Sequence, residues 1–273
     1  MKEVVIEAGR TERNYWRDLW RYRELFQVLA WRDFAVRYRQ TAVGVAWAVL
    51  RPVLTVSILT VIFHRVAGLA SVGDAPYALM VLAGMLPWMF FSTAMSDAAS
   101  SLVSNTSLVS KIYFPRMIVP TATVIVSIVD LLIGLVILAV LMVAYRYAPD
   151  WRILTLPALV LMAFLAALGP GLWITAVNVR YRDFRYVTPF IVQFGLYISP
   201  VGFAFDNIPE SWRLLYSINP MVGVINGFRW AVLGGEAPLY PQSLIISAVM
   251  IAALLWVGVW QFRKLERSFA DVI

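Results

Sequence analysis

Long apolar runs with little or no charge follow one another along this chain, and they restrict its fold more than any other feature. A helix needs about 20 mostly apolar residues to cross the hydrocarbon core of a bilayer. Runs of that order lie, with their flanks, at 42–66, 75–97, 116–145, 153–179, 187–205 and 242–262. The sequence therefore predicts an all-α integral membrane protein whose transmembrane domain, at 41–267, contains six transmembrane helices.

Composition excludes a soluble globular protein. Hydrophobic residues make up 61% of the chain and charged residues 14%, whereas soluble domains contain about 25% charged residues. The chain has no cysteine, which excludes disulfides, thiolate metal sites and cysteine nucleophiles.

The distribution of Lys and Arg predicts the orientation. Of the 23 basic residues, 18 lie in the N-terminal region through Arg51, in the connections after the second and fourth runs, and at the C-terminus. Because cytoplasmic segments are enriched in Lys and Arg, both termini are expected in the cytoplasm. The net charge of +7 is then a matter of membrane topology, and no nucleic-acid partner is expected.

The N-terminal region, at 1–40, contains an amphipathic stretch. Within 16–39, one predicted helical face is apolar and the opposite face is basic, although the match is imperfect. Such a helix is expected to lie along the cytoplasmic interface. Membrane anchoring and contact with a partner both remain open as its role.

The segment at 206–241 contains an uncharged run at 214–228 that is too short to span and is broken at Asn219-Pro220. Two short re-entrant helices fit this pattern, and an ordinary extracytoplasmic loop is the alternative. Non-helical backbone at membrane depth would have to be buried in protein or line a wet cavity.

Several kinds of chemistry lack their residues. The chain has one histidine, His64, and no Gly-Lys-Ser/Thr phosphate loop. We therefore expect no catalytic residue, no metal site and no cofactor in this chain. If ATP drives the protein, a separate subunit must bind it.

Two charged residues interrupt the apolar runs, and charges within spans are often functional. Arg51 either snorkels to the cytoplasmic headgroups or faces a cavity and attracts an anionic group such as phosphate. Asp130, with nearby Thr and Ser residues, is either a satisfied polar packing site or a proton carrier.

Six motifs occur in order along the chain: VRYRQTAVGVAWAVLRP (36–52), GMLPWMFF (84–91), SKIYFPR (110–116), NVRYRDFRYV (178–187), ISPV (198–201) and SINPMVGVINGFRWAVLG (217–234). Together they resemble the permease subunits of type-2 ABC transporters that export lipid-linked polysaccharides, namely O-antigen, capsule and teichoic-acid exporters. The resemblance covers about 16–267. It implies a homodimer in the bacterial inner membrane with two cytoplasmic ATPase subunits, which carry the ATP and magnesium.

The resemblance also implies a cytoplasmic coupling helix at 104–114 that seats in the ATPase. Its expected contact residues are Leu108, Val109, Lys111, Ile112 and Tyr113. Taken by itself, the segment also fits a plain connector that ends at a proline.

For the cargo, an undecaprenyl-linked glycan, the resemblance implies that Arg37, Arg39 and Arg51 hold the pyrophosphate. Guanidinium groups form paired hydrogen bonds with phosphate oxygens. Aromatic rings suit a glycan, and the candidates for lining the channel are Trp47, Trp88, Phe90, Tyr197 and Phe203. Packing or an interface belt is the alternative role of these rings.

The segment at 206–241 resembles the family's gate at the outer end of the channel. The gate candidates are Trp212, Asn219, Pro220, Gly223 and Gly227. The glycines are expected to allow close packing of the gate against its dimer mate.

Three other functions remain open. An ABC permease of this architecture could carry a drug or small lipid. A proton-driven secondary transporter would use Asp130 as its carrier. A membrane-embedded glycolipid enzyme is disfavoured because the chain lacks the residues for such catalysis.

Overall fold

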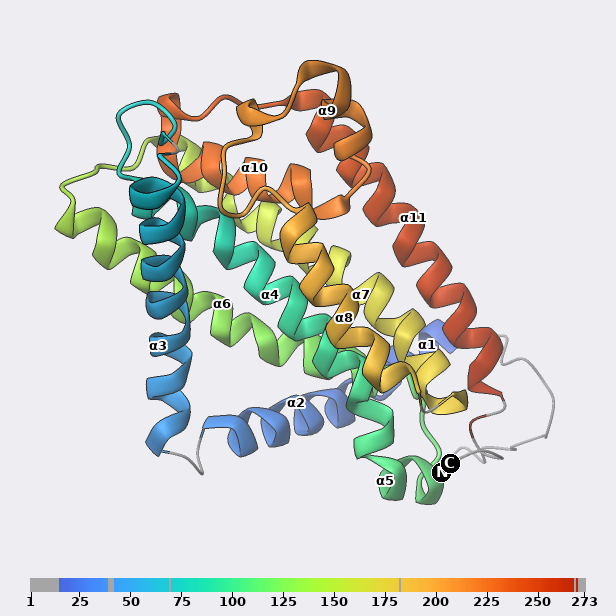
Figure 1. Ribbon diagram of the computed structural model, residues 1–273. Coiled ribbons are helices and arrows are strands. Elements are labelled where there is room, and N and C mark those ends of the chain that lie inside the picture. Colours follow the sequence, from blue (N-terminus) through green and yellow to red (C-terminus); the bar gives the residue numbers. More distant parts are fainter. Residues whose placement is uncertain (1–14, 39–41, 69, 182, 268, 270–273) are drawn as a thin grey trace.

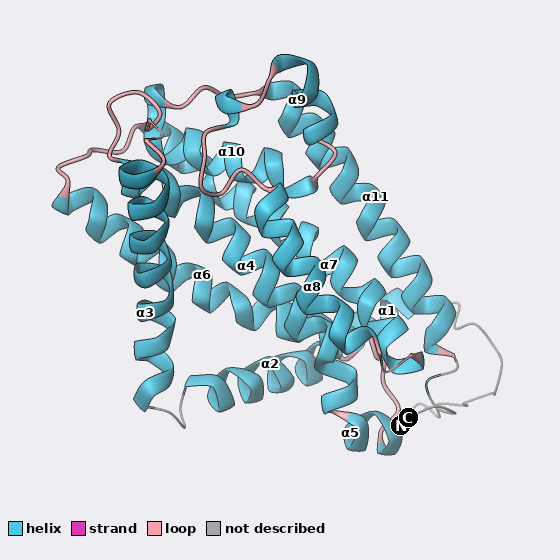
Figure 2. Cartoon of the chain, in the orientation of Figure 1, coloured by secondary structure: helices cyan, strands magenta, loops and turns pink. Residues whose placement is uncertain are grey.

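The computed structural model describes the chain except residues 1–14, 39–41, 69, 182, 268 and 270–273. Helices make up its regular structure, and the described residues include no strand (Figure 2). The α-helices are α1 (Tyr15–Arg21), α2 (Arg23–Tyr38), α3 (Ala42–Leu59), α4 (Tyr77–Ser104), α5 (Thr106–Lys111), α6 (Ile118–Ala144), α7 (Leu156–Arg180), α8 (Phe184–Ile198), α9 (Glu210–Tyr216), α10 (Pro220–Leu233) and α11 (Pro241–Glu266). Short helical turns are η1 (Thr60–Val66), η2 (Trp151–Thr155), η3 (Phe205–Asn207) and η4 (Gly234–Glu236).

Five helical stretches among the described residues are long and apolar enough to cross a membrane: Ala46–Val66, Tyr77–Ser104, Ile118–Ala144, Trp151–Arg180 and Pro241–Glu266. Each overlaps one of the runs predicted from the sequence. The chain is therefore a multi-pass α-helical membrane protein.

The run predicted as a span at 187–205 differs from the other five. Helix α8 has 15 residues, a length of about 22 Å, whereas the hydrocarbon core is about 30 Å thick. It ends at Ile198, before Ser199-Pro200, because proline disfavours helical backbone in the residue that precedes it. An uncharged run does not by itself reveal this break.

The long helices form an inclined bundle with shorter helices across both ends (Figure 1). Helices α2 and α5 lie at the lower end of this view, and α9 and α10 lie at the upper end. Helix α4 is central, since 83% of its most apolar window is buried, compared with 11% for α3. Helix α3 stands at one flank of the bundle and α11 stands at the other.

Close backbone approach holds α7 against α11. A Cβ placed on Gly169 would lie 2.7 Å from the backbone nitrogen of Leu255, and Gly258 on α11 faces Gly169 at the same contact. Small residues allow such approach where helices pack in a membrane. Glycines at these two positions therefore determine how closely the two helices pack.

Polar side chains join α7 to α4 inside the bundle. The Thr175 hydroxyl donates to the Ala98 carbonyl over 2.7 Å, and the Asn178 amide donates to the Ala99 carbonyl over 2.8 Å. Both side chains are buried. Because lipid offers no alternative partner, these bonds favour one register between the two helices.

The amphipathic stretch forms two helices rather than one. They meet at Tyr22, and the hydrogen bonds Tyr22 N–H to Asp18 C=O and Phe26 N–H to Tyr22 C=O carry the helical turn across the junction. Phe26 packs on a buried cluster at the lower end of the bundle, whereas Trp20 is exposed. The predicted apolar face is thus only partly turned toward the protein.

The first described helix and the end of the last helix meet. The Arg263 guanidinium on α11 lies 4.7 Å from the centre of the Tyr15 ring on α1. Both helix ends lie at the lower end of the bundle in Figure 1. The path from α1 to the end of α11 therefore returns to the end of the bundle at which it began.

Candidate translocation site

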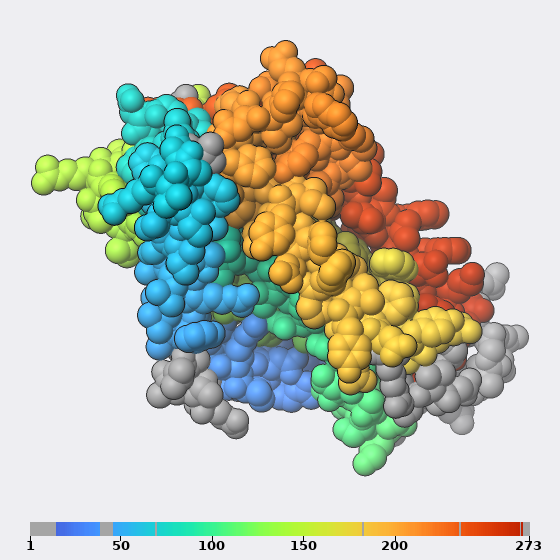
Figure 3. All heavy atoms as spheres, viewed as in Figure 1, coloured from blue at the N-terminus to red at the C-terminus, as the bar shows by residue number. Residues whose placement is uncertain are grey.

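The surface is hollowed between α3 and α8. Figure 3 shows the blue side chains of α3 and the yellow and orange side chains of α8 standing apart, with teal and green atoms of α4 deeper between them. Both bordering helices expose large apolar side chains, including Leu54 and Ile58 on α3 and Tyr197 on α8. We call this hollow the α3–α8 recess.

A separate apolar pocket of about 710 Å³ is lined mainly by residues of α4, α7, α8 and α11. Phe190 and Phe194, with ring centres 4.3 Å apart, project into it from α8. Its other aromatic lining residues are Trp88, Phe91 and Trp173. Such a wall accommodates an apolar chain better than a hydroxyl-rich sugar.

The five predicted channel aromatics have different environments. Trp47 on α3 is 59% exposed and Tyr197 on α8 is 72% exposed. Trp88 borders the apolar pocket, and Phe203 is half-buried. Phe90 is 2% exposed and packs inside the core, so it does not line a surface of this protomer.

The three predicted pyrophosphate ligands are also placed differently. Arg51 is exposed on α3, directly before Pro52. Arg37 is half-buried at the end of α2 and forms ion pairs with two carboxylates. Arg39 lies outside the described residues.

The ion pairs of Arg37 connect α2 to two long helices. Its guanidinium lies 3.1 Å from an Asp97 carboxylate oxygen on α4 and 3.4 Å from an Asp130 oxygen on α6. The Tyr38 hydroxyl donates to the other oxygen of Asp130. Burial, and then this hydrogen bond, raise the pKa of Tyr38, so the phenol stays protonated and remains a donor.

The sequence pattern does not single out Asp97, and it gives no partner for Asp130. Asp97 lies at the end of an apolar run, and a carboxylate in that position is only a weak indication of a functional site. The arginine that neutralises both is on a segment predicted to be peripheral, so their association depends on tertiary structure. We call Arg37, Tyr38, Asp97 and Asp130 the α2 charge cluster.

A second contact joins α2 to the beginning of the predicted coupling segment. The Arg32 guanidinium donates to the Asn105 side-chain carbonyl over 2.8 Å and to Asp33 over 2.7 Å. The Asn105 amide in turn donates to the Ser101 carbonyl. Helix α2 is thus linked to the junction between α4 and α5.

Within the segment predicted for coupling, the helix itself is α5, Thr106–Lys111. Val109 is 3% exposed and packs in the permease's own core, and Leu108 is half-buried beside that core. Lys111, Ile112 and Tyr113 are exposed. Any partner on this face would therefore contact these three side chains before Val109.

The segment predicted as a gate contains two short helices, α9 and α10, separated near Asn219-Pro220. The Asn219 side chain accepts from the Met221 amide over 3.0 Å, and its own amide donates to the Ser199 hydroxyl over 2.9 Å. Proline follows at the first turn of α10, where its missing N–H costs little. Asn219 thus caps α10 and fastens it to the end of α8, while Trp212 on α9 is exposed.

The expected packing of Gly223 and Gly227 against a dimer mate is wrong. A Cβ on Gly223 would lie 2.6 Å from the Ser247 hydroxyl on α11, and one on Gly227 would lie 2.6 Å from Leu159 on α7. Both glycines are buried in their own protomer. They allow α10 to pack closely on α7 and α11.

Arg229 on α10 is a buried cation that sequence reasoning placed only in an outer connection. It is 3% exposed, and its guanidinium donates to the carbonyl oxygens of Val201 at 2.7 Å, Phe203 at 2.8 Å and Met80 at 3.2 Å. One side chain thereby holds α10, α4 and the segment after α8 together.

The ABC-2 type transporter family matches residues 24–233, from α2 to the end of α10. This chain belongs to that family. The match includes the α3–α8 recess, the α2 charge cluster, α5 and Arg229.

Curated relatives match this ABC-2 permease along most of its length. The O-antigen export system permease protein RfbA of Myxococcus xanthus is 28% identical over 94% of this chain and 98% of the relative. A Klebsiella pneumoniae protein of the same name is 24% identical over 92% of this chain and 95% of the relative. The polysialic acid transport protein KpsM of Escherichia coli is 23% identical over 89% of this chain and 93% of the relative.

The resemblance derived from the six motifs is thereby confirmed, and the chain is the permease of an ABC-2 type transporter. Among the described residues of this ABC-2 permease, no group of three or more His, Cys, Asp or Glu side chains is arranged to hold a metal ion.

Proposed function

We propose that this chain is the channel-forming permease of an ATP-driven exporter that moves lipid-linked polysaccharide, such as undecaprenyl-linked O-antigen, across the bacterial inner membrane. The observation that carries the proposal is the α3–α8 recess, whose bordering helices are apolar yet exposed along most of their length. The names of the relatives, which include O-antigen export and polysialic acid transport proteins, support the cargo class.

The proposed assembly is a homodimer. The most apolar window of the span that contains α3 is 11% buried, and α8 exposes Tyr197, which does not belong to the separate apolar pocket. A second copy facing the recess would enclose a channel between the two protomers. This arrangement gives each half of the channel an apolar wall with aromatic rings.

We propose six membrane crossings. Five are the long helical stretches, and the additional one, which precedes α11 in the chain, is α8 together with the segment that follows it. Five crossings would leave α1 and the end of α11 on opposite sides of the membrane, whereas Arg263 and Tyr15 are in contact. An even number satisfies this contact. The basic connections predict that this shared side, and so both termini, is cytoplasmic.

On this proposal, the cargo's pyrophosphate meets Arg51, an exposed residue of α3, and Arg39, which lies outside the described residues, remains a further candidate ligand. Arg37 contributes as part of the α2 charge cluster, because its guanidinium already faces Asp97 and Asp130. Trp47 and Tyr197, both exposed, offer ring faces to the sugars. Trp88 and its pocket suit the apolar carrier chain.

The energy comes from two copies of a cytoplasmic ABC ATPase, which bind ATP and magnesium. Lys111, Ile112 and Tyr113 form the contact face, since they are the exposed members of the predicted coupling set. The link from Arg32 to Asn105 offers a path from this face to the interfacial helix. At the other end, α9 and α10 form a re-entrant gate that closes the channel.

The test is ATPase activity of the reconstituted permease–ATPase complex, with and without a lipid-linked glycan. The variant Ile112→Asp/Tyr113→Asp should lose glycan-stimulated turnover while it still inserts and folds. The matched control is Ser107→Asp/Ser110→Asp, which adds the same charge to exposed positions of α5 without removing apolar surface. Full stimulation in the first variant would contradict the coupling assignment.

Cargo is tested separately in a strain that lacks the chain. Lipid-linked polysaccharide should accumulate on the cytoplasmic face and should be exported again when the gene is restored. If no glycolipid accumulates, the alternative of a drug or small-lipid ABC permease is favoured.

The proton-driven alternative depends on Asp130. In this structure Asp130 is paired with Arg37 and accepts a hydrogen bond from Tyr38, which supports a structural role. Transport that is abolished by Asp130→Asn but unaffected by loss of the ATPase would favour the proton-driven mechanism instead.

A further inference from the structure

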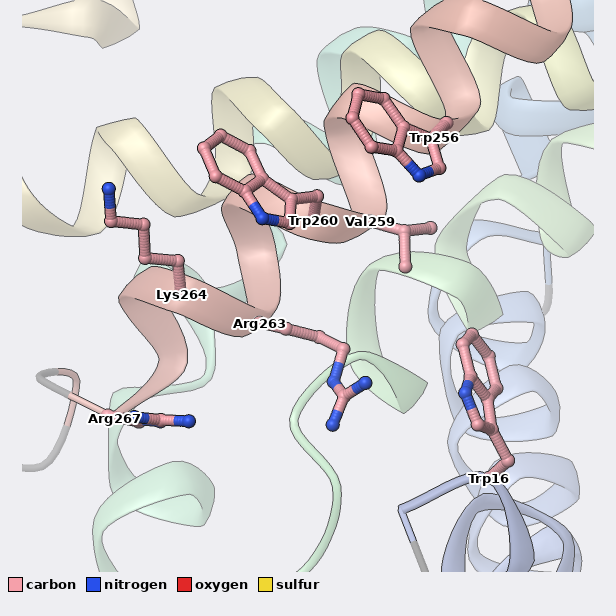
Figure 4. A pocket seen from close by; sticks show the side chains of 7 residues that line it. All are labelled: Trp16, Trp256, Val259, Trp260, Arg263, Lys264 and Arg267. Carbon is pink, nitrogen blue, oxygen red and sulfur yellow. The ribbon is translucent and has the colours of Figure 1, made fainter. Parts of the chain in front are cut away.

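A pocket of about 500 Å³ lies between the start of α1 and the last turns of α11. It combines three indole rings with three cationic side chains (Figure 4). Its lining residues are Trp16, Trp256, Val259, Trp260, Arg263, Lys264 and Arg267. None of them belongs to the segment matched by the ABC-2 family, which ends at residue 233 and begins after Trp16.

The lining of this pocket follows from helical spacing on α11. Trp256, Trp260 and Lys264 are four residues apart and lie on one face. The two indoles are stacked, with centres 6.3 Å apart and planes 9° from parallel, and the Lys264 ammonium lies 5.2 Å from the centre of the Trp260 ring. Along this face, apolar and amphipathic groups give way to a cation toward the helix end.

The neighbouring face of α11 carries Val259, Arg263 and Arg267. There too, an apolar residue is followed by cations toward the end of the helix. The Arg263 guanidinium lies 4.7 Å from the Tyr15 ring centre, which restricts its motion. In Figure 4 it extends from α11 toward the side of the pocket that Trp16 occupies. The Lys264 side chain extends away from Arg263 in this view, so the cations line the pocket from different sides of α11.

The electrostatic balance of the lining favours an anion. Among the described residues, those that line this pocket include no Asp or Glu. The nearest acidic side chain on this part of α11, Glu266, accepts a hydrogen bond from the Arg116 backbone amide over 2.8 Å. The Arg116 side chain also donates to the Glu266 backbone carbonyl over 2.9 Å, and the Glu266 carboxylate interacts with Tyr15 as well, so this one carboxylate lies beside the pocket but is engaged by other groups.

The location indicates a lipid. Helix α11 is one of the five candidate spans, and its basic end lies beside the interfacial helix α1. Above the pocket, α11 continues as an exposed apolar face that includes Ile245 and Val249. An acyl chain would follow that face, a glycerol backbone would meet the indoles, and a phosphate would meet the cations, which is the order across a membrane interface.

We propose that this pocket binds the headgroup of an anionic phospholipid from the leaflet that contains α1. The site is separate from the α3–α8 recess, because α11 and α3 lie at opposite flanks of the bundle (Figure 1). The bound lipid fastens α1 to α11. It is a resident of the protein and is not its cargo, so the proposal does not depend on which substrate is exported.

The test is lipid binding to the purified full-length chain, measured by native mass spectrometry. The delipidated protein is titrated with dioleoylphosphatidylglycerol, with dioleoylphosphatidylcholine, and with soluble glycerol phosphate as the free headgroup. We expect the tightest site to prefer phosphatidylglycerol. Glycerol phosphate should bind far more weakly, because it lacks the chains that contact α11.

The variant Arg263→Gln/Lys264→Gln should lower the affinity for phosphatidylglycerol roughly 10-fold or more, since each cation near an anionic lipid surface contributes about 5-fold. The single variant Lys264→Gln, at an exposed side chain, should lower it about 5-fold without affecting the fold. The matched control is Arg180→Gln/Arg185→Gln. It removes two cytoplasmic cations that also lie over aromatic rings, those of Tyr181 and Tyr186, but not in this pocket.

Retention of phosphatidylglycerol binding in Lys264→Gln and in the double variant overturns the proposal. An equal loss in the control pair also overturns it, because the effect would then be one of general charge. Equal affinity for glycerol phosphate would identify a free-phosphate site instead of a lipid site. Size-exclusion profiles that match the unmodified protein show that each variant is folded.

Discussion

The guanidinium of Arg37, at the end of helix α2, lies 3.1 Å from the carboxylate of Asp97 near the end of α4. The same guanidinium reaches Asp130 on α6. Three segments that are distant in the sequence are therefore joined by one side chain. The α2 charge cluster ties the position of α2 to that of the bundle.

Replacing Arg37 with Gln should destabilise the permease. It leaves two half-buried carboxylates without their shared cation, at a cost of about 1–2 kcal/mol given their partial exposure. The apparent melting temperature in detergent should fall. Arg23→Gln, at an exposed position on the same helix, is the matched control and should have little effect.

A double variant, Arg37→Gln/Asp97→Asn, provides a further check on this ion pair. Removing both partners should recover part of the loss, because one unpaired charge is removed as well. Additive losses in the double variant would mean that the pair does not interact appreciably.

Replacing Arg229 with Met should have a larger effect. The change keeps an apolar stem but leaves the carbonyls of Val201, Phe203 and Met80 without their donor. A buried group that loses its partner costs about 1–3 kcal/mol, so we expect a loss of about 3 kcal/mol or more. Thermal unfolding measures it, with Arg146→Met at an exposed position as the control, and equal melting temperatures for the two variants would contradict the prediction.

Replacing Gly169 with Val should separate α7 from α11. Its Cβ would lie 2.7 Å from the Leu255 backbone nitrogen, and backbone cannot move aside as a flexible side chain can. We expect loss of the folded, monodisperse species in size-exclusion chromatography. Ala252→Val, at an exposed position of α11, introduces the same side chain and should be tolerated, whereas normal behaviour of both variants would refute the close contact.

The phenol of Tyr240, in the connection before α11, should titrate at high pH. Burial, and then the hydrogen bond that it donates to Asp206, raise its pKa to about 12. Since the folded-state pKa lies above the ordinary value of about 10, this bond stabilises the fold fully below pH 10, and the contribution is lost as the pH rises toward 12.

The pKa of Tyr240 can be measured from phenolate absorbance at 295 nm in the unmodified protein and in Tyr240→Phe. The difference between the two titrations should remain near zero from pH 9 to about 11. A difference that rises with a midpoint near pH 10 would show that Tyr240 is an ordinary exposed phenol.

Sequence patterns predicted much of the local structure, because the relevant forces act within one segment. Apolar length identified the five long helices, and the Asn219-Pro220 break predicted two short helices between the last two runs, which are α9 and α10. The length of α8 was predicted less well, because Ser199-Pro200 interrupts an otherwise apolar run. To infer the number of crossings, the contact between Tyr15 and Arg263 is therefore needed in addition to the apolar runs.

The sequence by itself determined that this chain is a helical membrane protein with basic connections and a recognisable family. Only the tertiary structure decided which side chains face one another. A helix segment that is apolar all round has no polar face from which its orientation can be read, so the burial of Phe90 on α4 was not predictable. Likewise Arg37 and Arg229 each find partners on other helices, and such partners are chosen by packing rather than by spacing along the chain.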